Sequence, residues 1–280
     1  MKQYISIDVG GTNIRIGLLA ADHQRCQLEK VLSFPLIPDF NQAKKVIAEK
    51  IKTLSAEVSI EGVSLALPGP VTSEMLLAAG NLQSWEKRPI RSELEALLSL
   101  PVALVHDGSA SALGEAFYGG GQELDTFIYF TWGTGFGGAQ LVKSPSISLT
   151  YLEPAHQIKE WQGKECTCGQ RGCFEAYMGG WALNEKYDLA QIADTHSIWE
   201  DVTQITAQML INTLMFYPTE HFIFGGGLIA KRWFLLPKIR QVVQDNLTYC
   251  PVPTFSQAKL GEYSALYGGV ALFEQPIVLP

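Results

Sequence analysis

Two glycine-rich segments, each lying between two apolar runs, constrain the fold of this chain more than any other feature. The first covers residues 8–13, Asp-Val-Gly-Gly-Thr-Asn, and the second covers residues 133–138, Gly-Thr-Gly-Phe-Gly-Gly. The flanking runs have the apolar, β-type character of strands, so each segment predicts a strand–turn–strand unit. A dinucleotide site differs, because its glycines open a helix. We therefore expect two glycine turns of one kind, one in each half of the chain.

Turns of this kind are suited to binding phosphate. Glycine has no Cβ and reaches positive φ, so its backbone N–H groups can approach an anion closely. The candidate phosphate-binding residues are Gly10, Gly11 and Thr12 in the first turn and Gly133, Thr134 and Gly135 in the second. Asp8 is a candidate outer-shell partner of Mg²⁺, an ion that keeps several of its waters. The alternative is a pair of tight hairpin turns that bind no ligand.

Apolar periodicity predicts that strands and helices alternate around these turns. We expect helices over residues 41–56, 90–98, 109–117 and 199–216, and strands over residues 62–67, 102–105, 126–132, 139–142 and 221–224. Because each half opens with strand–turn–strand, the order indicates an α/β fold built from a duplicated domain, with a cleft between the halves. We place the first domain at residues 1–110 and the second at residues 111–280.

Composition excludes several classes of protein. The 280 residues are 47% hydrophobic and 18% charged, which is typical of a globular chain with a core. The formal net charge is −7 and Lys and Arg form no block, so we expect no nucleic-acid partner. No apolar run approaches the roughly 20 residues of a spanning helix, and the N-terminus does not resemble a signal peptide, so we expect no membrane association.

Three of the five cysteines fall within eight residues, which favours a metal site over a disulfide framework and indicates a reducing, cytoplasmic location. The candidate ligands are His156, Cys166, Cys168 and Cys173. Thiolate and imidazole in a set of four are typical of structural zinc, and no coordination position would remain for water. A cluster of reduced cysteines is the alternative.

Asp107 follows the predicted strand at residues 102–105, at its carboxyl end, where ligands gather in open α/β sheets. A carboxylate there can act as general base and accept the proton of an attacking hydroxyl. The alternative is that Asp107 caps the helix that begins near Gly108, because Asp is a favoured N-cap residue.

Taken together, these motifs resemble the ROK family of the actin–hexokinase superfamily over nearly the whole chain. The segments at residues 8–12 and 133–138 resemble its two phosphate loops, and Asp107 with Gly114-Glu115 resembles its catalytic segment. Cys166-x-Cys168-Gly169-x-x-Gly172-Cys173-x-Glu175 is similar to the family's zinc signature. The resemblance implies a two-domain actin–hexokinase (ribonuclease H-like) ATPase fold with an interdomain cleft.

The resemblance also implies functional residues and partners. It implies ATP with Mg²⁺ bound at the two loops, and an adenosine-side turn formed by Gly225, Gly226 and Gly227. The expected sugar-binding residues are Gly69, Asn81, His106, Asp107, Glu153, His156 and Glu175. The expected activity is ATP-dependent phosphorylation of a hydroxyl of a hexose or N-acetylhexosamine, by a homodimer.

This chain departs from the family pattern on the sugar side. His106 replaces the Asn that usually precedes the catalytic Asp, and residues 153–156 read Glu-Pro-Ala-His where Glu-x-Gly-His is usual. The segment before Glu153 is also shorter. A regulatory sugar-binding protein that has lost turnover is therefore an alternative function. A repressor is a further alternative, but we see no room before the strand at Tyr4 for a DNA-binding segment.

Overall fold

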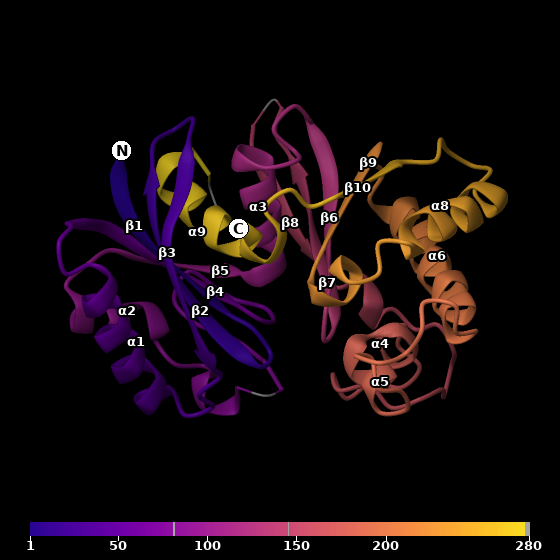
Figure 1. Cartoon of the computed structure of the whole chain (residues 1–280), viewed down its shortest axis with the longest axis horizontal. Helices are drawn as coiled ribbons and strands as arrows, with labels where there is room; N and C mark the ends of the chain where they lie inside the picture. The colour runs from indigo at the N-terminus through magenta and orange to yellow at the C-terminus, as the bar shows by residue number, and fades with distance from the viewer. Residues whose placement is uncertain (81, 145, 278–280) are drawn as a thin grey trace.

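The computed structural model describes residues 1–80, 82–144 and 146–277. Two five-stranded sheets form the two halves of the molecule, and helices pack against both sheets (Figure 1). The α/β prediction is confirmed, and every helix and strand predicted above is present within a few residues of its expected bounds.

The first sheet has the strand order β3-β2-β1-β4-β5. Its strands are β1 (Lys2–Val9), β2 (Asn13–Ala21), β3 (Cys26–Pro35), β4 (Ile60–Leu67) and β5 (Val102–His106). β1 and β2 form the predicted hairpin around the first glycine turn, and β4 and β5 continue the sheet in parallel with β1. Parallel pairing brings the carboxyl ends of β1, β4 and β5 to one edge of the sheet.

The second sheet repeats this topology with the order β8-β7-β6-β9-β10. Its strands are β6 (Thr126–Trp132), β7 (Phe136–Val142), β8 (Ser148–Leu152), β9 (His221–Gly225) and β10 (Thr254–Gln257). Again the first strand forms an antiparallel hairpin around a glycine turn and pairs in parallel with a later strand. The repeated topology confirms the duplication expected from the sequence.

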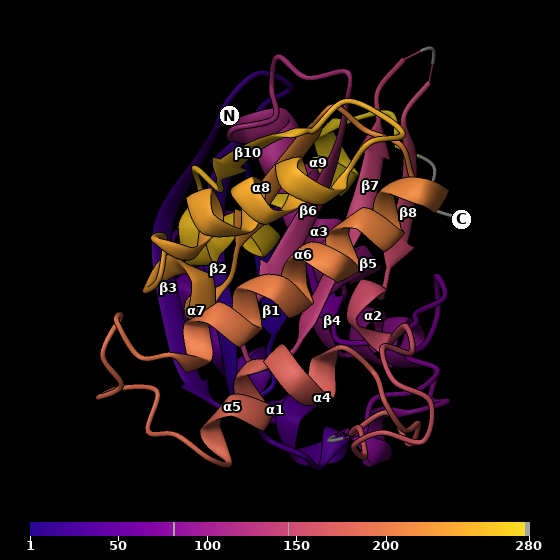
Figure 2. The ribbon, with the colours of Figure 1, turned by 90° about the vertical axis from the view of Figure 1, so that its right-hand side faces the viewer.

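Amphipathic helices cover the sheets. The first sheet packs against α1 (Phe40–Leu54) and α2 (Ile90–Leu98) in one apolar core. The second packs against α6 (Ile198–Phe216) and α8 (Leu235–Asn246) in another. Figure 2 shows α6 and α8 in front of the second sheet. Short helices α4 (Glu175–Met178), α5 (Gly180–Asn184) and α7 (Gly227–Ala230) lie near the glycine turns.

Two helices, α3 (Asp107–Tyr118) and α9 (Ser264–Glu274), pack on each other between the sheets (Figure 1). Helix α3 contacts β6 and β7, whereas α9, at the end of the chain, returns to β1 and β4. Glycine makes the close crossing possible, since a Cβ added at Gly268 would lie 1.6 Å from the Ala110 carbonyl oxygen. The domain boundary near residue 110 would lie inside α3, and it stays a prediction.

The buried side chain of Glu115, in α3, stabilises the contact between α3 and α9 through hydrogen bonds. It accepts hydrogen bonds from the backbone nitrogens of Lys259 and Leu260 and from the Ser264 hydroxyl. A buried carboxylate is stable only when its oxygens are paired in this way. These bonds fix α3, which contacts the second sheet, to the start of α9, which contacts the first sheet.

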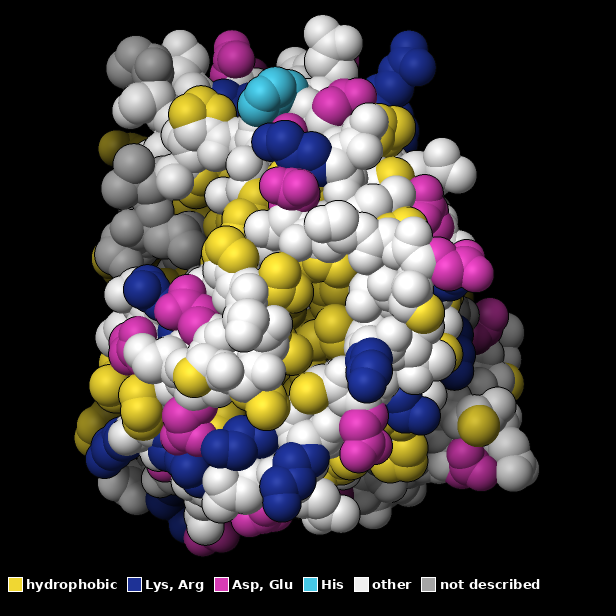
Figure 3. Space-filling model, turned by 90° about the vertical axis from the view of Figure 1, so that its left-hand side faces the viewer, with side chains coloured by type: hydrophobic (Ala, Val, Ile, Leu, Met, Phe, Trp, Pro, Cys, Tyr) yellow, Lys and Arg dark blue, Asp and Glu magenta, His cyan; other side chains and the backbone are white. Residues whose placement is uncertain are grey.

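The outer surface of the first half mixes charges of both signs. Figure 3 shows acidic and basic side chains interspersed around a central hollow lined by apolar side chains. Within the part of the chain that the structure describes, no helix combines the length and apolar character needed to cross a bilayer.

Candidate active site

The two glycine turns meet across the halves of the molecule. A Cβ added at Gly11 would lie 4.0 Å from the Thr134 hydroxyl oxygen, although these residues belong to different sheets. Both Gly11 and Thr134 are exposed. The first turn is held by the Gly10 N–H, which donates to the Asn13 carbonyl at 2.9 Å. The two predicted loops are thus brought together by the fold.

Hydrogen bonds orient the second turn. The carbonyl oxygens of Gly133 and Thr134 accept from the backbone nitrogens of Gly180 and Trp181, at 3.2 and 2.8 Å. These two negative dipole ends therefore point at the start of α5, away from any anion bound on the opposite side. Within the turn, the Gly133 N–H donates to the Gly135 carbonyl at 3.0 Å, and phosphate binding here stays a prediction.

The predicted adenosine-side turn lies beside the second turn. β6 and β9 pair Thr131 with Gly225, and a Cβ added at Gly133 would lie 3.7 Å from the Gly227 nitrogen. Gly226 has φ +96°, and a Cβ there would lie 2.5 Å from the Trp132 backbone. Only glycine fits both demands at this position.

Asp8 is the last residue but one of β1, at the same edge, and is buried. Its Oδ2 lies 3.3 Å from Nη1 of Arg15, and Arg15 also pairs with Glu262. Burial and the nearby Asp107 carboxylate raise the pKa of Asp8 to about 6, against the opposing effect of Arg15. A carboxyl group with a raised pKa is a common feature of functional sites, and a bound cation would lower the pKa again.

Asp107 lies where the sequence predicts it, directly after β5. Pairing of β4 with β5 sets His106 opposite Leu67, and pairing of β1 with β4 sets Asp8 opposite Ala66. Asp8 and Asp107 therefore approach each other at one sheet edge. The side chain of Asp107 is 33% exposed, so a substrate hydroxyl can reach it.

The capping interpretation of Asp107 can be compared with the helix start itself. Helix α3 begins at Asp107, and its N-cap residue is His106, whose Nδ1 accepts from the Ser109 N–H at 3.4 Å. Asp107 Oδ1 accepts from the adjacent Gly108 N–H, at 2.6 Å. The cap is thus His106, and Asp107 is the acidic residue of the first helical turn; its role as a base stays a prediction.

Glu153 reaches the same place from the loop after β8. Its Oε1 lies 3.2 Å from His106 Nε2, and that same nitrogen lies 3.4 Å from Asp107 Oδ1. A 3₁₀ turn at Pro154–His156 joins Glu153 to His156, whose backbone nitrogen donates to the Glu153 carbonyl at 3.1 Å. The four-residue spacing therefore connects this carboxylate to the metal cluster.

These groups shift one another's proton affinity. Burial opposes a positive charge on His106, but the carboxylates of Asp107 and Glu153 outweigh it and raise the pKa of the imidazole. Burial also raises the pKa of Asp107, partly offset by His106 and reinforced by Glu153. A raised pKa makes Asp107 a stronger proton acceptor than an ordinary surface carboxylate.

Glu175 links the cysteine-containing loop at residues 166–173 to the second glycine turn. Its Oε2 accepts from the Phe136 N–H at 2.9 Å, and its Oε1 accepts from the Trp181 indole at 3.0 Å. The residue is buried, with 6% of its surface exposed. Both oxygens thus have partners inside the protein, and the expected contact between Glu175 and a sugar stays a prediction.

The predicted metal ligands form one cluster. The ligand atoms of His156, Cys166, Cys168 and Cys173 all lie within 4.8 Å of one another. Cys168 Sγ is 3.7 Å from Cys173 Sγ, and Cys166 Sγ is 3.6 Å from His156 Nδ1. A zinc tetrahedron would set two sulfurs about 3.8 Å apart and a sulfur and a nitrogen about 3.6 Å apart. The residues therefore fit a zinc ion.

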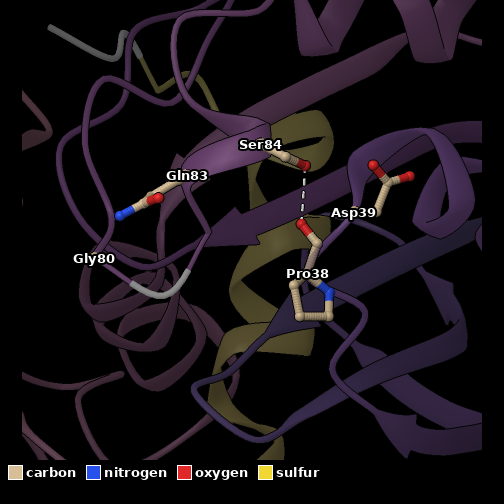
Figure 4. A pocket seen from close by; sticks show the side chains of 5 residues that line it. All are labelled: Pro38, Asp39, Gly80, Gln83 and Ser84. Atoms are coloured by element: carbon tan, nitrogen blue, oxygen red, sulfur yellow. Dashed lines mark hydrogen bonds between the residues drawn. The ribbon is translucent and has the colours of Figure 1, made fainter.

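The rest of the predicted sugar side is only partly described. Asn81 lies outside the described residues. Gly69 turns the chain after β4 with φ +89°, and a Cβ there would meet the Ala78 carbonyl oxygen at 2.3 Å. A cavity of about 390 Å³ is lined by Pro38, Asp39, Gly80, Gln83 and Ser84. Figure 4 shows these residues, with Ser84 donating to the Pro38 carbonyl at 2.9 Å. None of the predicted carboxylates lines this cavity.

Sequence reasoning missed Arg15 and Trp181, the partners of Asp8 and Glu175. Arg15 could have been found, because a hairpin that turns at residues 10–12 pairs residue 8 with residue 15. Trp181 carries no such signal, since its contact depends on how α4 and α5 fold back on the second turn.

The fold and the site define a class of protein: a duplicated α/β chain with facing glycine turns and a carboxylate between them. The chain belongs to the ROK family, which it matches over residues 4–276. The glucokinase of Thermotoga maritima is 26% identical, over 98% of this chain and 98% of its own length. The N-acetylmannosamine kinase of Vibrio vulnificus is 28% identical, over 97% and 98%.

A solved structure gives the same fold. The ROK family glucokinase from Streptomyces griseus, in complex with glucose and AMPPNP, superposes with a TM-score of 0.81 at 22% identity. The match covers 96% of this chain and 98% of that one. The predicted actin–hexokinase fold is thereby confirmed.

Proposed function

We propose that this protein is an ATP-dependent sugar kinase that transfers the γ-phosphoryl group to a hydroxyl of a hexose or N-acetylhexosamine. The approach of Gly11 to Thr134, with Asp8 and Asp107 at the adjoining sheet edge, carries the proposal. Phosphoryl transfer needs positioning and charge neutralisation more than covalent chemistry. The glycine turns would supply the positioning, and a cation held beside Asp8 would supply the neutralisation. The names of the relatives support the same activity.

Each residue has a role in this proposal. Gly10, Gly11, Thr12, Gly133, Thr134 and Gly135 bind the phosphates, and Gly225, Gly226 and Gly227 lie beside the adenosine. Asp8 binds the hydration shell of Mg²⁺, which neutralises charge on the transferred group. Asp107 accepts the proton of the attacking hydroxyl. Gly69, Asn81, His106, Glu153, His156 and Glu175 form the sugar side.

A zinc ion held by His156, Cys166, Cys168 and Cys173 is part of the proposal, with a structural role. Burial and the neighbouring thiols raise the pKa of Cys173, so a divalent cation is needed to keep it as a thiolate near neutral pH. We further propose a cytoplasmic homodimer without a nucleic-acid partner.

The experiment is an assay of sugar-dependent ADP release over a panel of hexoses and N-acetylhexosamines. We expect one group of sugars to give turnover of about 1–100 s⁻¹. The second candidate function is a regulatory sugar-binding protein without turnover, which is favoured by the presence of His106 in place of the usual Asn. Calorimetry with the same panel measures sugar binding and so distinguishes this function from that of a kinase. Binding of a sugar without ADP release in the presence of Mg²⁺-ATP would identify a regulatory protein and contradict the proposal.

A further inference from the structure

His106 is the residue at which this chain departs from its family next to the proposed base, and its ring has partners on both sides. Nδ1 lies 3.4 Å from the Ser109 nitrogen, while Nε2 lies 3.2 Å from Glu153 and 3.4 Å from Asp107. The side chain is only 5% exposed. Both ring nitrogens therefore contact the protein itself.

The backbone partner determines which nitrogen carries the proton. The Ser109 N–H can only donate, so Nδ1 must be the acceptor and must be unprotonated. In the neutral imidazole the proton is then on Nε2, where it points at the two carboxylates. One N–H thus lies between an acid from α3 and an acid from the loop after β8.

The His106 Nε2–H lies between two carboxylates of like charge, and it offsets their repulsion. Asp107 and Glu153 repel each other, and Asp8 adds a third carboxylate from β1 that Arg15 from β2 only partly offsets. Tyr151 of β8 packs against the imidazole with ring centroids 5.2 Å apart, which limits tilting of the ring. A fixed donor between Asp107 and Glu153 therefore holds their separation and orientation.

We propose that His106 is a positioning residue, whose Nε2–H bridges Asp107 and Glu153 and aims the base at the acceptor hydroxyl. The inference rests on the proposed kinase function. Asp107 Oδ1 is used by the Gly108 N–H and faces His106, so Oδ2 is the oxygen that takes the proton. Glu153 is held beside it as the acceptor of a second sugar hydroxyl.

Two substitutions separate the bridge from the helix cap. His106→Asn keeps an acceptor near the Nδ1 position but is too short to reach Glu153. His106→Gln places an amide N–H near the Nε2 position but loses the Nδ1 acceptor. If His106 is a positioning residue, turnover should be kept in His106→Gln, which retains the bridge to Glu153. If its role is purely structural, turnover should be kept in His106→Asn, which retains the helix cap.

The kinetic test compares kcat, KM for ATP and thermal stability in both variants. We expect His106→Gln to keep kcat within about threefold and His106→Asn to lose about tenfold or more with KM for ATP unchanged, as expected when a positioning contact is lost. Thermal stability should rank in the opposite order, because only Asn keeps the cap. His196 is the matched control, since its Nδ1 accepts from the Ile198 N–H at 3.1 Å on an exposed surface. His196→Asn and His196→Gln should leave kcat unchanged.

A second test needs no activity. The ¹⁵N chemical shifts of the five histidines, with His106 assigned from the His106→Asn spectrum, report which ring nitrogen is protonated. We expect the Nε2–H form at a pH above the pKa of His106, which the two carboxylates raise. The Nδ1–H form, or a kcat that falls with stability in His106→Gln and not in His106→Asn, would overturn the inference. Lack of sugar-dependent ADP release in the wild-type chain would instead contradict the proposed function.

Discussion

Glu175 Oε2 accepts a hydrogen bond from the Phe136 N–H at 2.9 Å, so the metal loop and the second glycine turn share a buried contact. Glu175 lies two residues after Cys173, at the start of α4. Since Trp181 holds the other oxygen, the carboxylate cannot move without loosening the turn. The cluster of His156, Cys166, Cys168 and Cys173 is therefore coupled to the second glycine turn, the proposed nucleotide loop, as well as to the proposed sugar side.

Removal of the metal should consequently impair ATP binding. We expect about one zinc per freshly purified chain by elemental analysis. Cys168→Ser should lower the thermal midpoint and raise the KM for ATP together with that for sugar, because metal binding is coupled to local folding. Cys250→Ser, outside the cluster, is the control. A zinc-free chain with an unchanged thermal midpoint on addition of zinc would refute the site.

Asp8 should make the protein less stable as the pH rises. Its pKa of about 6 in the folded chain exceeds the ordinary value of 3.8, so the native state binds more protons between these values. Stability contributed by protonated Asp8 is full below about pH 4 and is lost as the pH rises through about 6.

Asp8→Asn should therefore stabilise the protein at pH 7.5 by up to about 3 kcal/mol, at 1.36 kcal/mol per pKa unit, and the gain should vanish near pH 4. Urea unfolding of both chains across this range is the measurement. The same variant should lose turnover with Mg²⁺-ATP, because the cation loses its carboxylate partner. Equal stability of the two chains at pH 7.5 would show that the folded protein does not raise the pKa of Asp8.

The close contact of α3 and α9 should not tolerate a side chain at Gly268. Gly268→Ala would set a Cβ 1.6 Å from the Ala110 carbonyl oxygen, a backbone atom that cannot turn aside. We expect a loss of stability of about 1–3 kcal/mol or more from this overpacking. Gly80→Ala is the control, since its Cβ would meet its nearest neighbour at 3.8 Å. Chemical denaturation of both variants should separate them clearly.

The sequence allows much of this site to be predicted because the chemistry is concentrated in short segments. The glycine turns, Asp107 and the four metal ligands are each identified by local spacing, and strand pairing then brings Asp8 and Asp107 to one edge. The contact of Glu175 with Phe136 could not be predicted in this way. It depends on the packing of α4 against the second turn, which no periodicity encodes.

The return of α9 to the first sheet was also not predicted. Most of the residues of α9 are buried, so no single apolar face identifies its partner, and Gly268 and Gly269 are the residues that reflect the close crossing. His106 is a case of a different kind, since the sequence shows its type but not its partners, which come from the start of α3 and from the loop after β8. Tertiary geometry, not residue type, determines which nitrogen faces the carboxylates.

Asp107→Asn is the direct test of the proposed base. The amide keeps the shape of the side chain and can still accept from the Gly108 N–H, but it cannot take a proton. We expect kcat to fall by about 10²–10⁴-fold while the dissociation constants for sugar and nucleotide change little. Isothermal titration and single-turnover assays would measure the two effects separately. The His106 cap is untouched, so thermal stability should not fall. Wild-type turnover in this variant, with the best sugar of the panel, would show that Asp107 is not the base. Proton transfer would then use another group, and Glu153, whose Oε1 lies 3.2 Å from His106 Nε2, is the next carboxylate to test.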